Sequence, residues 1–445
     1  MKDMNTIAAI ATPNGVGAIS ILRISGEGAL SIAKKLIKKE LTPRIATLAK
    51  VYDLKNNLID IALVIYFKAP YSFTGEDVIE FQCHGGYVVS RLILEEVLKA
   101  GGRLANPGEF SKRAFLNGKI DATQAEAIAK LIETRSVEGA RVLSRQLEGE
   151  LKEFVEDIRN RLVEIMAYSE VFIDYAEEDL PESLGGEIGK KLNEIKNVLE
   201  KTLEASQRRQ GIINGYKVSI VGKPNVGKSS ILNALLNKNR AIVSNIAGTT
   251  RDTIEEDIQI GSHLIKIIDT AGIRVAKDEI EKIGVERSKK AIEESDIILG
   301  VFEANNFNKE DEKIFDLIKN SKKEAIIVIN KVDLGINIDL NRFKNFEIVK
   351  ISAKKDINEL IETIKKLLDN KEGENEHILT SLRQIEMIKK SLKAINEAEE
   401  FLDTGELELF SYNIQDAIKA VSEITRPFEY DEMLDKMFGS FCVGK

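Results

Sequence analysis

The most specific chemical pattern in the sequence is the stretch VSIVGKPNVGKSSILNALL, residues 218–236. An apolar strand precedes a glycine-rich loop, and a helix follows it. The spacing fits G-x-x-x-x-G-K-[ST], with fixed positions at Gly222, Gly227, Lys228 and Ser229. The glycines allow backbone N–H groups to point at phosphate oxygens near the positive end of the helix. Lys228 would neutralise the outer phosphates and Ser229 would ligate magnesium, so the stretch predicts a nucleoside triphosphate site.

Two segments further along predict contacts to the terminal phosphate and its metal ion. LIKIIDTAG ends a buried strand with Asp269, which can hold the magnesium shell, and Gly272, whose amide can sense the γ-phosphate. SNIAGTTRD offers the hydroxyls of Thr249 and Thr250 to a metal or to the same phosphate. A Gly-Thr-Thr sequence is weak evidence alone, but in this order and spacing it predicts a switch segment.

The segments AIIVINKVD and KISAKK predict which base is bound. Asp333 can accept two hydrogen bonds from N1–H and the exocyclic amine of guanine, while Asn330 and the backbone around Ser352 and Ala353 serve the carbonyl side. Adenine presents an acceptor where guanine presents a donor. ATP would therefore leave a buried carboxylate unpaired, at a cost on the order of 1 to 3 kcal/mol. We predict a guanine-nucleotide site.

The elements around these motifs predict a multidomain α/β chain. Residues 215–372 alternate strands with helices, which is typical of a P-loop GTPase domain with a doubly wound parallel sheet. Residues 1–118 alternate short strands with turns and a few helices, which predicts an α+β domain. Residues 119–214 and 373–445 have helical periodicity. We interpret these two blocks as one discontinuous α-helical domain with the GTPase domain inserted; two separate helical domains are the alternative.

Composition limits the classes of function. Hydrophobic residues make up 43% and charged residues 31%, a soluble globular profile. Lys and Arg number 64 against 72 Asp and Glu, a net charge of -8, so any contact with nucleic acid is expected to be confined and specific. No run approaches the roughly 18 apolar residues of a membrane helix, and the N-terminus makes a poor signal peptide. We expect a cytoplasmic protein without membrane contact.

Cysteine and histidine usage excludes two further classes. Cys83 and Cys442 are the only cysteines, which provides no disulfide framework, and the three histidines are far apart without zinc spacing. The adjacent Cys83 and His84 invite a metal or nucleophile reading. A structural pair at the end of a strand is the favoured interpretation.

The position after the Asp-x-x-Gly element, where many GTPases place a water-orienting Gln, is Ile273, which cannot position water. The nearby polar candidates for that role are Glu281, Arg274, Arg251 and Asp252. On the sequence alone, a carboxylate such as Glu281 more often belongs to a solvated helix face.

Four segments together resemble the MnmE (TrmE) family of tRNA-modification GTPases: GKPNVGKSS, IAGTTRD, DTAGIR followed by EIEKIGVER, and the terminal FCVGK. The resemblance extends over essentially the whole chain. It implies that Glu281 orients the attacking water, that GTPase domains of two subunits dimerise, and that a potassium ion takes the place of an arginine finger. The implied ligands are Ser229 and Thr250 for magnesium, and Asn225, Ser244, Ile246 and Thr249 for potassium.

The motifs and the resemblance together predict the full set of GTP contacts. These are Asn225, Val226, Gly227, Lys228, Ser229, Ser230, Ser244, Asn245, Ile246, Ala247, Gly248, Thr249, Thr250, Asp269, Thr270, Ala271, Gly272, Asn330, Lys331, Asp333, Ser352, Ala353 and Lys354.

For the N-terminal domain, the resemblance implies a folate-binding, aminomethyltransferase-like fold that also forms a homodimer. The residues that match the family's folate contacts are Arg23, Glu80, Lys119 and Lys445. A pterin edge needs a carboxylate, which suits Glu80, and cations suit the glutamyl tail. The implied ligand is 5-formyltetrahydrofolate or methylene-tetrahydrofolate.

The reaction that the resemblance implies adds an aminomethyl or carboxymethylaminomethyl group to carbon 5 of the wobble uridine of certain tRNAs. The implied partner is MnmG (GidA), which carries FAD and forms a heterotetramer with the homodimer. A ribosome-assembly or signalling GTPase is the alternative, because related GTPases share the same nucleotide motifs. An intact nucleotide site disfavours a stand-alone folate aminomethyltransferase.

The ending FCVGK superficially copies a prenylation box, but Gly444 and Lys445 break that pattern. A disposable tail is the usual default for a chain end. The apolar FGSF before it can dock, and the family match places this end near the folate. We therefore predict that Cys442 is a catalytic thiol of the modification reaction and that Lys445 contacts the folate.

Overall fold

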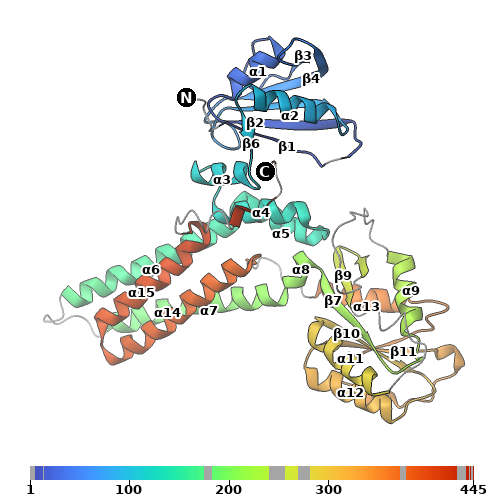
Figure 1. The fold of residues 1–445 in the computed structure, drawn as a ribbon. Coiled ribbons are helices and arrows are strands. Elements are labelled where there is room, and N and C mark those ends of the chain that lie inside the picture. Colours follow the sequence, from blue (N-terminus) through green and yellow to red (C-terminus); the bar gives the residue numbers. More distant parts are fainter. Residues whose placement is uncertain are drawn as a thin grey trace. The chain divides into compact units, whose positions relative to one another are not determined.

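The computed structural model describes residues 6–13, 15–174, 183–239, 256–268, 281–370, 377–427, 437–439, 441 and 444. The chain divides into two compact units, and each has its own sheet and its own pair of long helices (Figure 1). The first unit comprises Met1–Ala129, Gln146–Asp174 and Leu407–Lys445, and the second comprises Lys130–Arg145 and Tyr175–Glu406.

The first unit contains a six-stranded sheet in the order β3-β4-β5-β2-β1-β6. Its strands are β1 (Ile7–Ile10), β2 (Ile19–Ser25), β3 (Thr47–Tyr52), β4 (Leu58–Phe67), β5 (Val78–His84) and β6 (Arg103–Leu104). Neighbours are antiparallel except β1 and β6, which are parallel. Helices α1 (Ala29–Ile37) and α2 (Val89–Lys99) pack their apolar residues on one face. This is the α+β arrangement predicted for the N-terminal segment.

Strand β4 shows how the pleat sorts side chains between the two faces of this sheet. Ala62 and Val64 are buried in the core with the helices, whereas Ile61 and Leu63 are 45% and 40% exposed. Successive side chains of a strand point to opposite faces, so the exposed pair lies on the face away from that core. Leu48 of β3, paired directly with Leu63, is 60% exposed. The sheet therefore has one packed face and one face with exposed apolar side chains.

The second unit contains the other six-stranded sheet, in the order β12-β11-β10-β7-β9-β8. Its strands are β7 (Tyr216–Val221), β8 (Glu256–Ile260), β9 (His263–Ile268), β10 (Ile297–Glu303), β11 (Glu324–Asn330) and β12 (Glu347–Lys350). All pairings are parallel except that of β8 with β9. The helices around it include α9 (Lys228–Asn239), α11 (Glu281–Glu294), α12 (Lys309–Ser321) and α13 (Asn358–Asp369).

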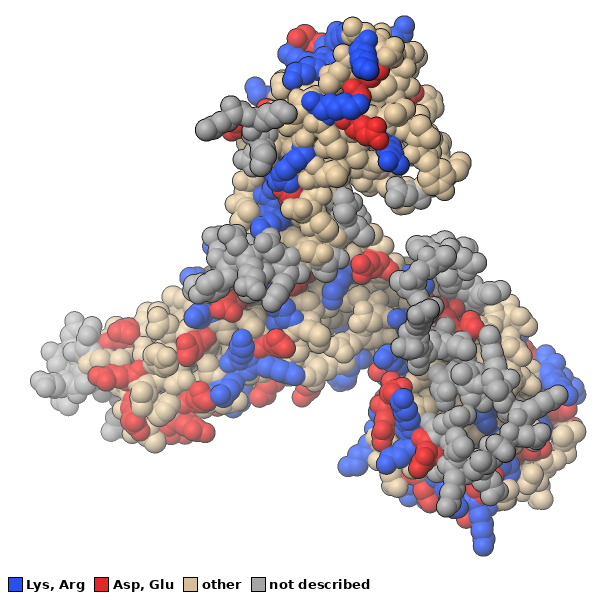
Figure 2. Space-filling model, viewed as in Figure 1, with Lys and Arg blue, Asp and Glu red and all other residues tan. Residues whose placement is uncertain are grey.

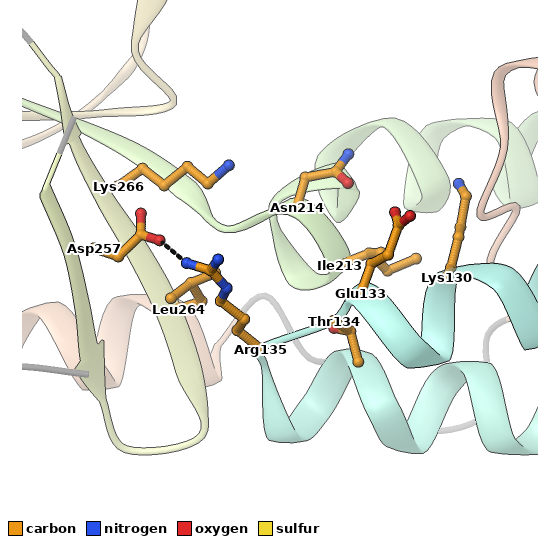
Figure 3. Close-up of a pocket in the computed structure, with 9 residues that line it drawn as sticks. All are labelled: Lys130, Glu133, Thr134, Arg135, Ile213, Asn214, Asp257, Leu264 and Lys266. Atoms are coloured by element: carbon orange, nitrogen blue, oxygen red, sulfur yellow. Dashed lines mark hydrogen bonds and ion pairs between the residues drawn. The ribbon is translucent and has the colours of Figure 1, made fainter. Parts of the chain in front are cut away.

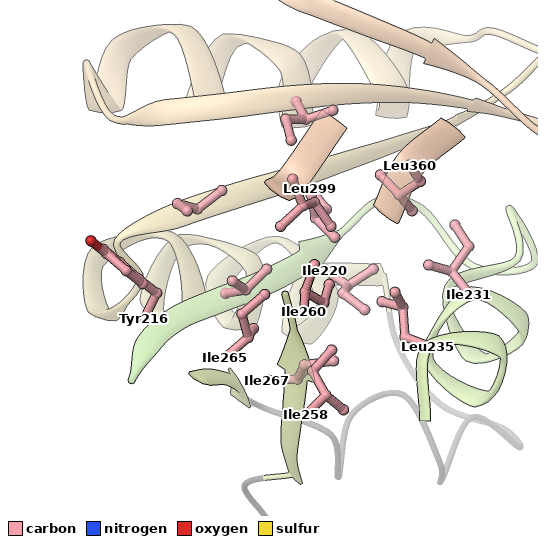
Figure 4. Close-up of a cluster of buried hydrophobic side chains, with 14 of the residues drawn as sticks. Tyr216, Ile220, Ile231, Leu235, Ile258, Ile260, Ile265, Ile267, Leu299 and Leu360 are labelled. Carbon is pink, nitrogen blue, oxygen red and sulfur yellow. The ribbon is translucent and has the colours of Figure 1, made fainter. Parts of the chain in front are cut away.

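Side chains on both faces of this second sheet are buried. In β10, Leu299 and Val301 join a cluster with residues of α9 and α13, whereas Ile298 and Phe302 join another with residues of α11 and α12. Figure 4 shows the first cluster, in which Ile231 and Leu235 of α9 and Leu360 of α13 face the strands. Full burial of each such side chain contributes roughly 1.5 to 3 kcal/mol. The alternation explains why β10 reads as a continuous apolar run, and it gives the doubly wound architecture that was predicted.

Two strands carry little strand signal in their sequences: β6 and β8. Strand β6 has only two residues, too few for a periodic signal. Strand β8 has the sequence EDIQI, whose charged and polar residues gave no strand signal. It lies at the edge of the sheet, where one side needs no partner, and it makes the predicted parallel sheet a mixed one.

Each unit pairs one long helix from residues 119–214 with one from residues 373–445. In the first unit, α6 (Glu150–Asp174) packs along α15 (Leu407–Thr425). In the second, α7 (Ser183–Arg208) packs along α14 (Leu382–Thr404), and an ion pair of 2.6 Å joins Lys196 to Glu399. Helices from the two sequence blocks therefore pair with each other, as expected if the GTPase domain is inserted between them. That all four helices form one domain, and the domain boundaries, stay predictions.

The shorter helices complete the two units. They are α3 (Glu109–Leu116), α4 (Ala122–Glu133), α5 (Val137–Glu148), α8 (Gln210–Asn214) and the 3-10 turns η1 (Val332–Leu334) and η2 (Leu340–Phe343). Among the described residues, no helix is both long and apolar enough to cross a membrane.

Cys83 is a structural residue, as predicted. It is 2% exposed near the end of β5, and burial raises the pKa of its thiol to about 11. The thiol donates to the Ser20 carbonyl at 3.3 Å. His84 points outward and lies 2.7 Å from Asp60. A thiol with so high a pKa is neutral at pH 7 and is a poor nucleophile or metal ligand.

Candidate functional site

The glycine-rich loop, residues 222–227, joins β7 to α9 in the second unit. A Cβ on Gly222 would lie 2.4 Å from the Val301 carbonyl oxygen, so only glycine fits there. Asn225 and Gly227 have left-handed backbones, with φ of 63° and 105°. The loop thus has the strand before it and the helix N-terminus after it that the motif requires.

Lys228 is the first residue of α9, and its ammonium reaches back across the loop. It donates to the carbonyl oxygens of Gly222 at 2.6 Å and Lys223 at 2.8 Å. Burial lowers the pKa of this amine, and a bound polyanion would favour its charged form. The side chain is therefore already placed where the loop would surround a phosphate.

Ser229 and Ser230 follow Lys228 in the first turn of α9, where helix N–H groups have no helical partner. The Ser229 side chain is exposed, and its hydroxyl oxygen is a ligand type that Mg²⁺ accepts. Asn225 is exposed as well, and its side-chain amide oxygen suits a hard cation such as K⁺. These residues fit the predicted metal roles in chemistry.

The Asn330 side chain links the glycine-rich loop to the segment around Ala353 that is predicted to contact the base. Its Nδ2 donates to the Val226 carbonyl at 2.8 Å, and its Oδ1 accepts from the Ala353 amide at 3.0 Å. The side chain is 2% exposed and passes so close that a Cβ on Gly227 would lie 2.1 Å from Nδ2. The Asn330 side chain thus brings together segments that lie 104 and 23 positions away from it in sequence.

Asp333 lies in η1, immediately after β11, with its carboxylate facing solvent. A hydrogen bond from the Ser352 side chain is the largest of the effects that hold the pKa of this carboxyl below its usual value. The charges of Lys355 and Lys354 act in the same direction. The carboxylate is therefore ionised and available as an acceptor for the donor edge of a guanine, which fits the predicted base contact.

The remaining predicted GTP and metal residues lie outside the described residues. They are Ser244, Asn245, Ile246, Ala247, Gly248, Thr249, Thr250, Asp269, Thr270, Ala271 and Gly272. Glu281 is the first residue of α11, and its side chain also lies outside the described part, as do Cys442 and Lys445.

In the first unit, Arg23 and Glu80 occupy directly paired positions of β2 and β5. Arg23 Nε and Nη2 lie 2.9 Å and 2.8 Å from the same oxygen, Glu80 Oε1. The guanidinium also lies over the rings of Phe73 and Phe110, 5.8 Å and 5.7 Å from their centroids. The predicted folate residues on the sheet thus form one ion pair, whose guanidinium also contacts two aromatic rings.

Lys119 is exposed beside the loop that joins β4 to β5. A Cβ on Gly75 would lie 3.2 Å from Lys119 Cε. The preceding Thr74 hydrogen-bonds Ser25 at 2.7 Å, two residues beyond Arg23 on β2. Lys119 is therefore connected to Arg23 through this loop rather than by direct contact.

Residues on both sides of Cys442 pack within the first unit. Phe438 and Phe441 join a cluster with Ala125, and a Cβ on Gly444 would lie 2.6 Å from the Ile10 carbonyl oxygen. Ile10 ends β1, which pairs with β2 where Arg23 lies. This packing disfavours the disposable-tail alternative for the chain end.

A separate polar cavity of about 320 Å³ lies in the second unit (Figure 3). Its lining residues are Lys130, Glu133, Thr134, Arg135, Ile213, Asn214, Asp257, Leu264 and Lys266. Arg135 pairs with Asp257 at 2.8 Å, and Lys130 donates to the Thr380 carbonyl, so two of its three cations already have partners. None of the predicted nucleotide or folate residues lines it.

Two further candidate residues of the nucleotide site, Lys223 and Glu303, are not among those predicted from the sequence. Lys223, inside the glycine loop, forms a buried 2.7 Å ion pair with Asp311 at the start of α12. Glu303, at the end of β10, pairs with Lys331 at 3.0 Å. A carboxylate at the end of an apolar strand is a sequence pattern that could have indicated Glu303. No pattern near Lys223 in the sequence indicates that Asp311 is its partner.

The fold and these contacts define a P-loop protein of the guanine-nucleotide-binding class. The protein-family model described as GTP-binding protein TrmE N-terminus matches residues 6–119, and the family model described as MnmE helical domain matches residues 123–442. A relative from Aliarcobacter butzleri is 56% identical over 100% of both chains, and one from Sulfurimonas denitrificans is 56% identical over 99% of both. Each is named tRNA modification GTPase MnmE. The chain belongs to the MnmE (TrmE) family, and the predicted enzyme class, a GTPase, is confirmed.

Among solved structures, the chain is similar to the G domain of the T. maritima iron transporter FeoB, at 23% identity and a TM-score of 0.27. The match covers 35% of this chain and 99% of that one. The family assignment rests on the full-length relatives instead.

Proposed function

We propose that the chain is a potassium-activated GTPase that acts with an FAD-dependent MnmG (GidA) partner in the cytoplasm. Together they would add aminomethyl or carboxymethylaminomethyl groups to carbon 5 of the wobble uridine of certain tRNAs. Guanine-nucleotide binding is supported most directly by Asn330, because its side chain bonds both to the glycine-rich loop and to the Ala353 amide in the predicted base-binding segment. The tRNA part is supported by the name that the relatives bear.

In the proposed hydrolysis, Lys228 holds the outer phosphates, and the amides of the glycine loop bind their oxygens. Ser229 and Thr250 would hold Mg²⁺, and Asn225 with Ser244, Ile246 and Thr249 would hold K⁺. Cations bound there would offset the negative charge that develops on the phosphate oxygens. Ile273 cannot orient water, and the likeness to the MnmE family implies that Glu281, at the start of α11, takes that role.

Base selection would depend on Asp333. Its ionised carboxylate accepts two hydrogen bonds from guanine, while Ser352 keeps it in place. The other contacts proposed for the nucleotide are those of Lys331, Ala353 and Lys354.

The folate proposal is supported by the state of Glu80. Both bonds from Arg23 end on Oε1, which leaves Oε2 as the oxygen that a pterin edge would meet. Its side chain is 15% exposed, so a ligand can reach it. Lys119 and Lys445 are proposed for the anionic glutamyl tail, and Cys442 for the modification step, with Phe441 and Gly444 holding that end near β1.

The homodimer proposal is supported by the open face of the first sheet. Leu48 and Leu63 lie opposite each other on β3 and β4 and are 60% and 40% exposed. Ile61 and Ile19 are also exposed, at 45% and 61%. Exposed apolar side chains gathered on one sheet face mark an interaction surface.

Charge supports the proposed division of labour with a partner. On the face shown in Figure 2, basic and acidic side chains are interspersed over the described residues, without a continuous basic band. A surface of this kind holds tRNA weakly by itself, because phosphate contacts supply most of the non-specific affinity. The partner would provide the larger share of the basic surface.

The decisive test is nucleoside analysis of tRNA from a strain that lacks this chain. Loss of the carbon-5 modification at wobble uridines is expected, and unchanged wobble uridines would favour the alternative of a ribosome-assembly or signalling GTPase. The cation mechanism is tested separately, by measuring GTP turnover in potassium and in sodium at equal ionic strength. Turnover should be much faster in potassium; equal rates would exclude potassium as the activating ion.

A further inference from the structure

The carboxylate of Glu303 forms an ion pair with the turn that carries the predicted base contacts Asn330 and Asp333. Its Oε1 is 3.0 Å from Lys331 Nζ, and the two side chains are 14% and 31% exposed. Lys331 stands between Asn330 and Asp333 in a left-handed conformation, with φ of 62°. A non-glycine residue adopts this conformation at a cost, so other contacts must hold it.

Backbone bonds tie the same turn to the end of β10. Glu303 is paired with Asn330 in the parallel register of β10 and β11. The Ala304 amide donates to the Asn330 carbonyl at 2.9 Å, and the Asn337 amide donates to the Ala304 carbonyl at 2.8 Å. Both ends of the segment from Asn330 to Asn337 are therefore bonded to Ala304, the residue after Glu303.

The connection that follows Glu303 is anchored at its other end to the phosphate loop. Lys223 Nζ donates to the Asn306 carbonyl at 2.6 Å and to Asp311 Oδ2 at 2.7 Å. The two side chains of this ion pair are 6% and 0% exposed, and Asp311 also accepts from the Asn308 amide at 2.9 Å. A buried pair is broken only at a large penalty, so this connection is a fixed support for Glu303.

We propose that Glu303 is a positioning residue for guanine recognition, which acts through Lys331 to hold the turn that carries Asp333. Asp333 itself is exposed and has two tethers: Ser352 holds its carboxylate, and the pair of Lys331 with Glu303 holds its backbone. Loss of the second tether would let the carboxylate move relative to the base while the phosphate loop stayed in place. The inference rests on the proposed guanine-nucleotide function.

The test is Glu303→Gln in the full chain, with affinities for GDP and for inosine diphosphate measured by competition against a fluorescent nucleotide. Guanine offers Asp333 two hydrogen-bond donors, and hypoxanthine offers it one. A displaced carboxylate therefore weakens the binding of GDP more than the binding of inosine diphosphate. We expect the Kd for GDP to rise about five- to tenfold and the preference for GDP over inosine diphosphate to shrink.

Two further variants make the result specific. Glu303→Asp keeps the charge and should restore part of the preference. Glu312 lies on α12 and forms an exposed ion pair with Arg342. Glu312→Gln removes its charge and should change neither Kd.

Three outcomes would overturn the inference. A Kd for GDP that is unchanged in Glu303→Gln would exclude a positioning role. Equal losses for GDP and inosine diphosphate, with the preference intact, would show that Glu303 only supports the fold. A wild-type chain without preference for GDP over ADP would overturn the proposed nucleotide specificity first, and this inference with it.

Discussion

The two sheets hold their candidate site residues by different means. In the second unit, the residues follow the carboxyl ends of parallel strands, and backbone shape fixes them: Gly222 and Gly227 leave room that no side chain could share. In the first unit, Arg23 and Glu80 lie within antiparallel strands, and opposite charge fixes them. A site built by backbone shape therefore has a local sequence signature, whereas a site built by an ion pair across strands depends on strand register.

Ion pairs in the first unit are not confined to Arg23 and Glu80. Glu109 accepts from both Arg103 and Arg113, and Arg113 also pairs with Glu76 at 2.9 Å. This network joins α3 to the loop before β5. The first unit should therefore respond to pH and to loss of charge, while the nucleotide site should respond to loss of one cation or of loop geometry.

The largest expected effect is on the nucleotide site alone. Lys228→Ala removes the cation that the loop places on the phosphates, and GTP turnover should fall about 100- to 1000-fold. The matched control is Lys238→Ala at the exposed end of the same helix, where the lysine pairs with Asp356. Steady-state phosphate release measures both. Equal losses in the two variants would mean that helix integrity, not the loop cation, is being measured.

The next effect should be confined to the first unit. The pKa of Glu109 is lowered to about 2: burial acts to raise it, but bonds from Arg103, the Asn106 amide and Arg113 outweigh that effect. A lowered pKa stabilises the folded state above the unfolded value of about 4.5, and this contribution is lost as the pH falls toward 2. It amounts to about 3 kcal/mol.

Glu109→Gln tests this pH dependence. The variant should be less stable than the wild type at pH 7, and the difference should close between pH 4.5 and pH 2. Thermal unfolding followed by circular dichroism at several pH values measures it, since the chain has no tryptophan to follow. A difference that stayed constant down to pH 2 would show that packing, not charge, explains the loss.

The smallest expected effect tests whether folate binding in the first unit can be weakened without changing GTP turnover in the second. Glu80→Gln removes the charge proposed for the pterin edge, and folate affinity should weaken about tenfold. GTP turnover should be unchanged, because Glu80 belongs to the other unit. Glu95→Gln, an exposed carboxylate paired with Arg91 on α2, is the control. Calorimetric titration with 5-formyltetrahydrofolate measures the affinity; equal affinities in the two variants would remove Glu80 from the site.

The contrast between the units also explains what could be predicted from sequence. Lys228 and Asn330 were found because their motifs are short and fixed in spacing, and the sheet that positions them has long apolar strands. The pair of Lys223 with Asp311 spans 88 positions, and that of Arg23 with Glu80 spans 57, so no local pattern relates the partners. Arg23 and Glu80 were named from a family resemblance, but their ion pair was not. Strand β8 was missed because edge strands tolerate polar sequences.

The space that Gly227 leaves for the Asn330 amide has a consequence for protein engineering. Because a Cβ at position 227 would lie 2.1 Å from Nδ2, the phosphate loop and the asparagine at the end of β11 share one volume and cannot be redesigned independently. Asp333 carries no such constraint, since its carboxylate faces solvent and the side-chain hydrogen bond that holds the carboxylate comes from Ser352. A designer who wants a different base in this domain should leave positions 227 and 330 untouched and vary position 333 together with 352.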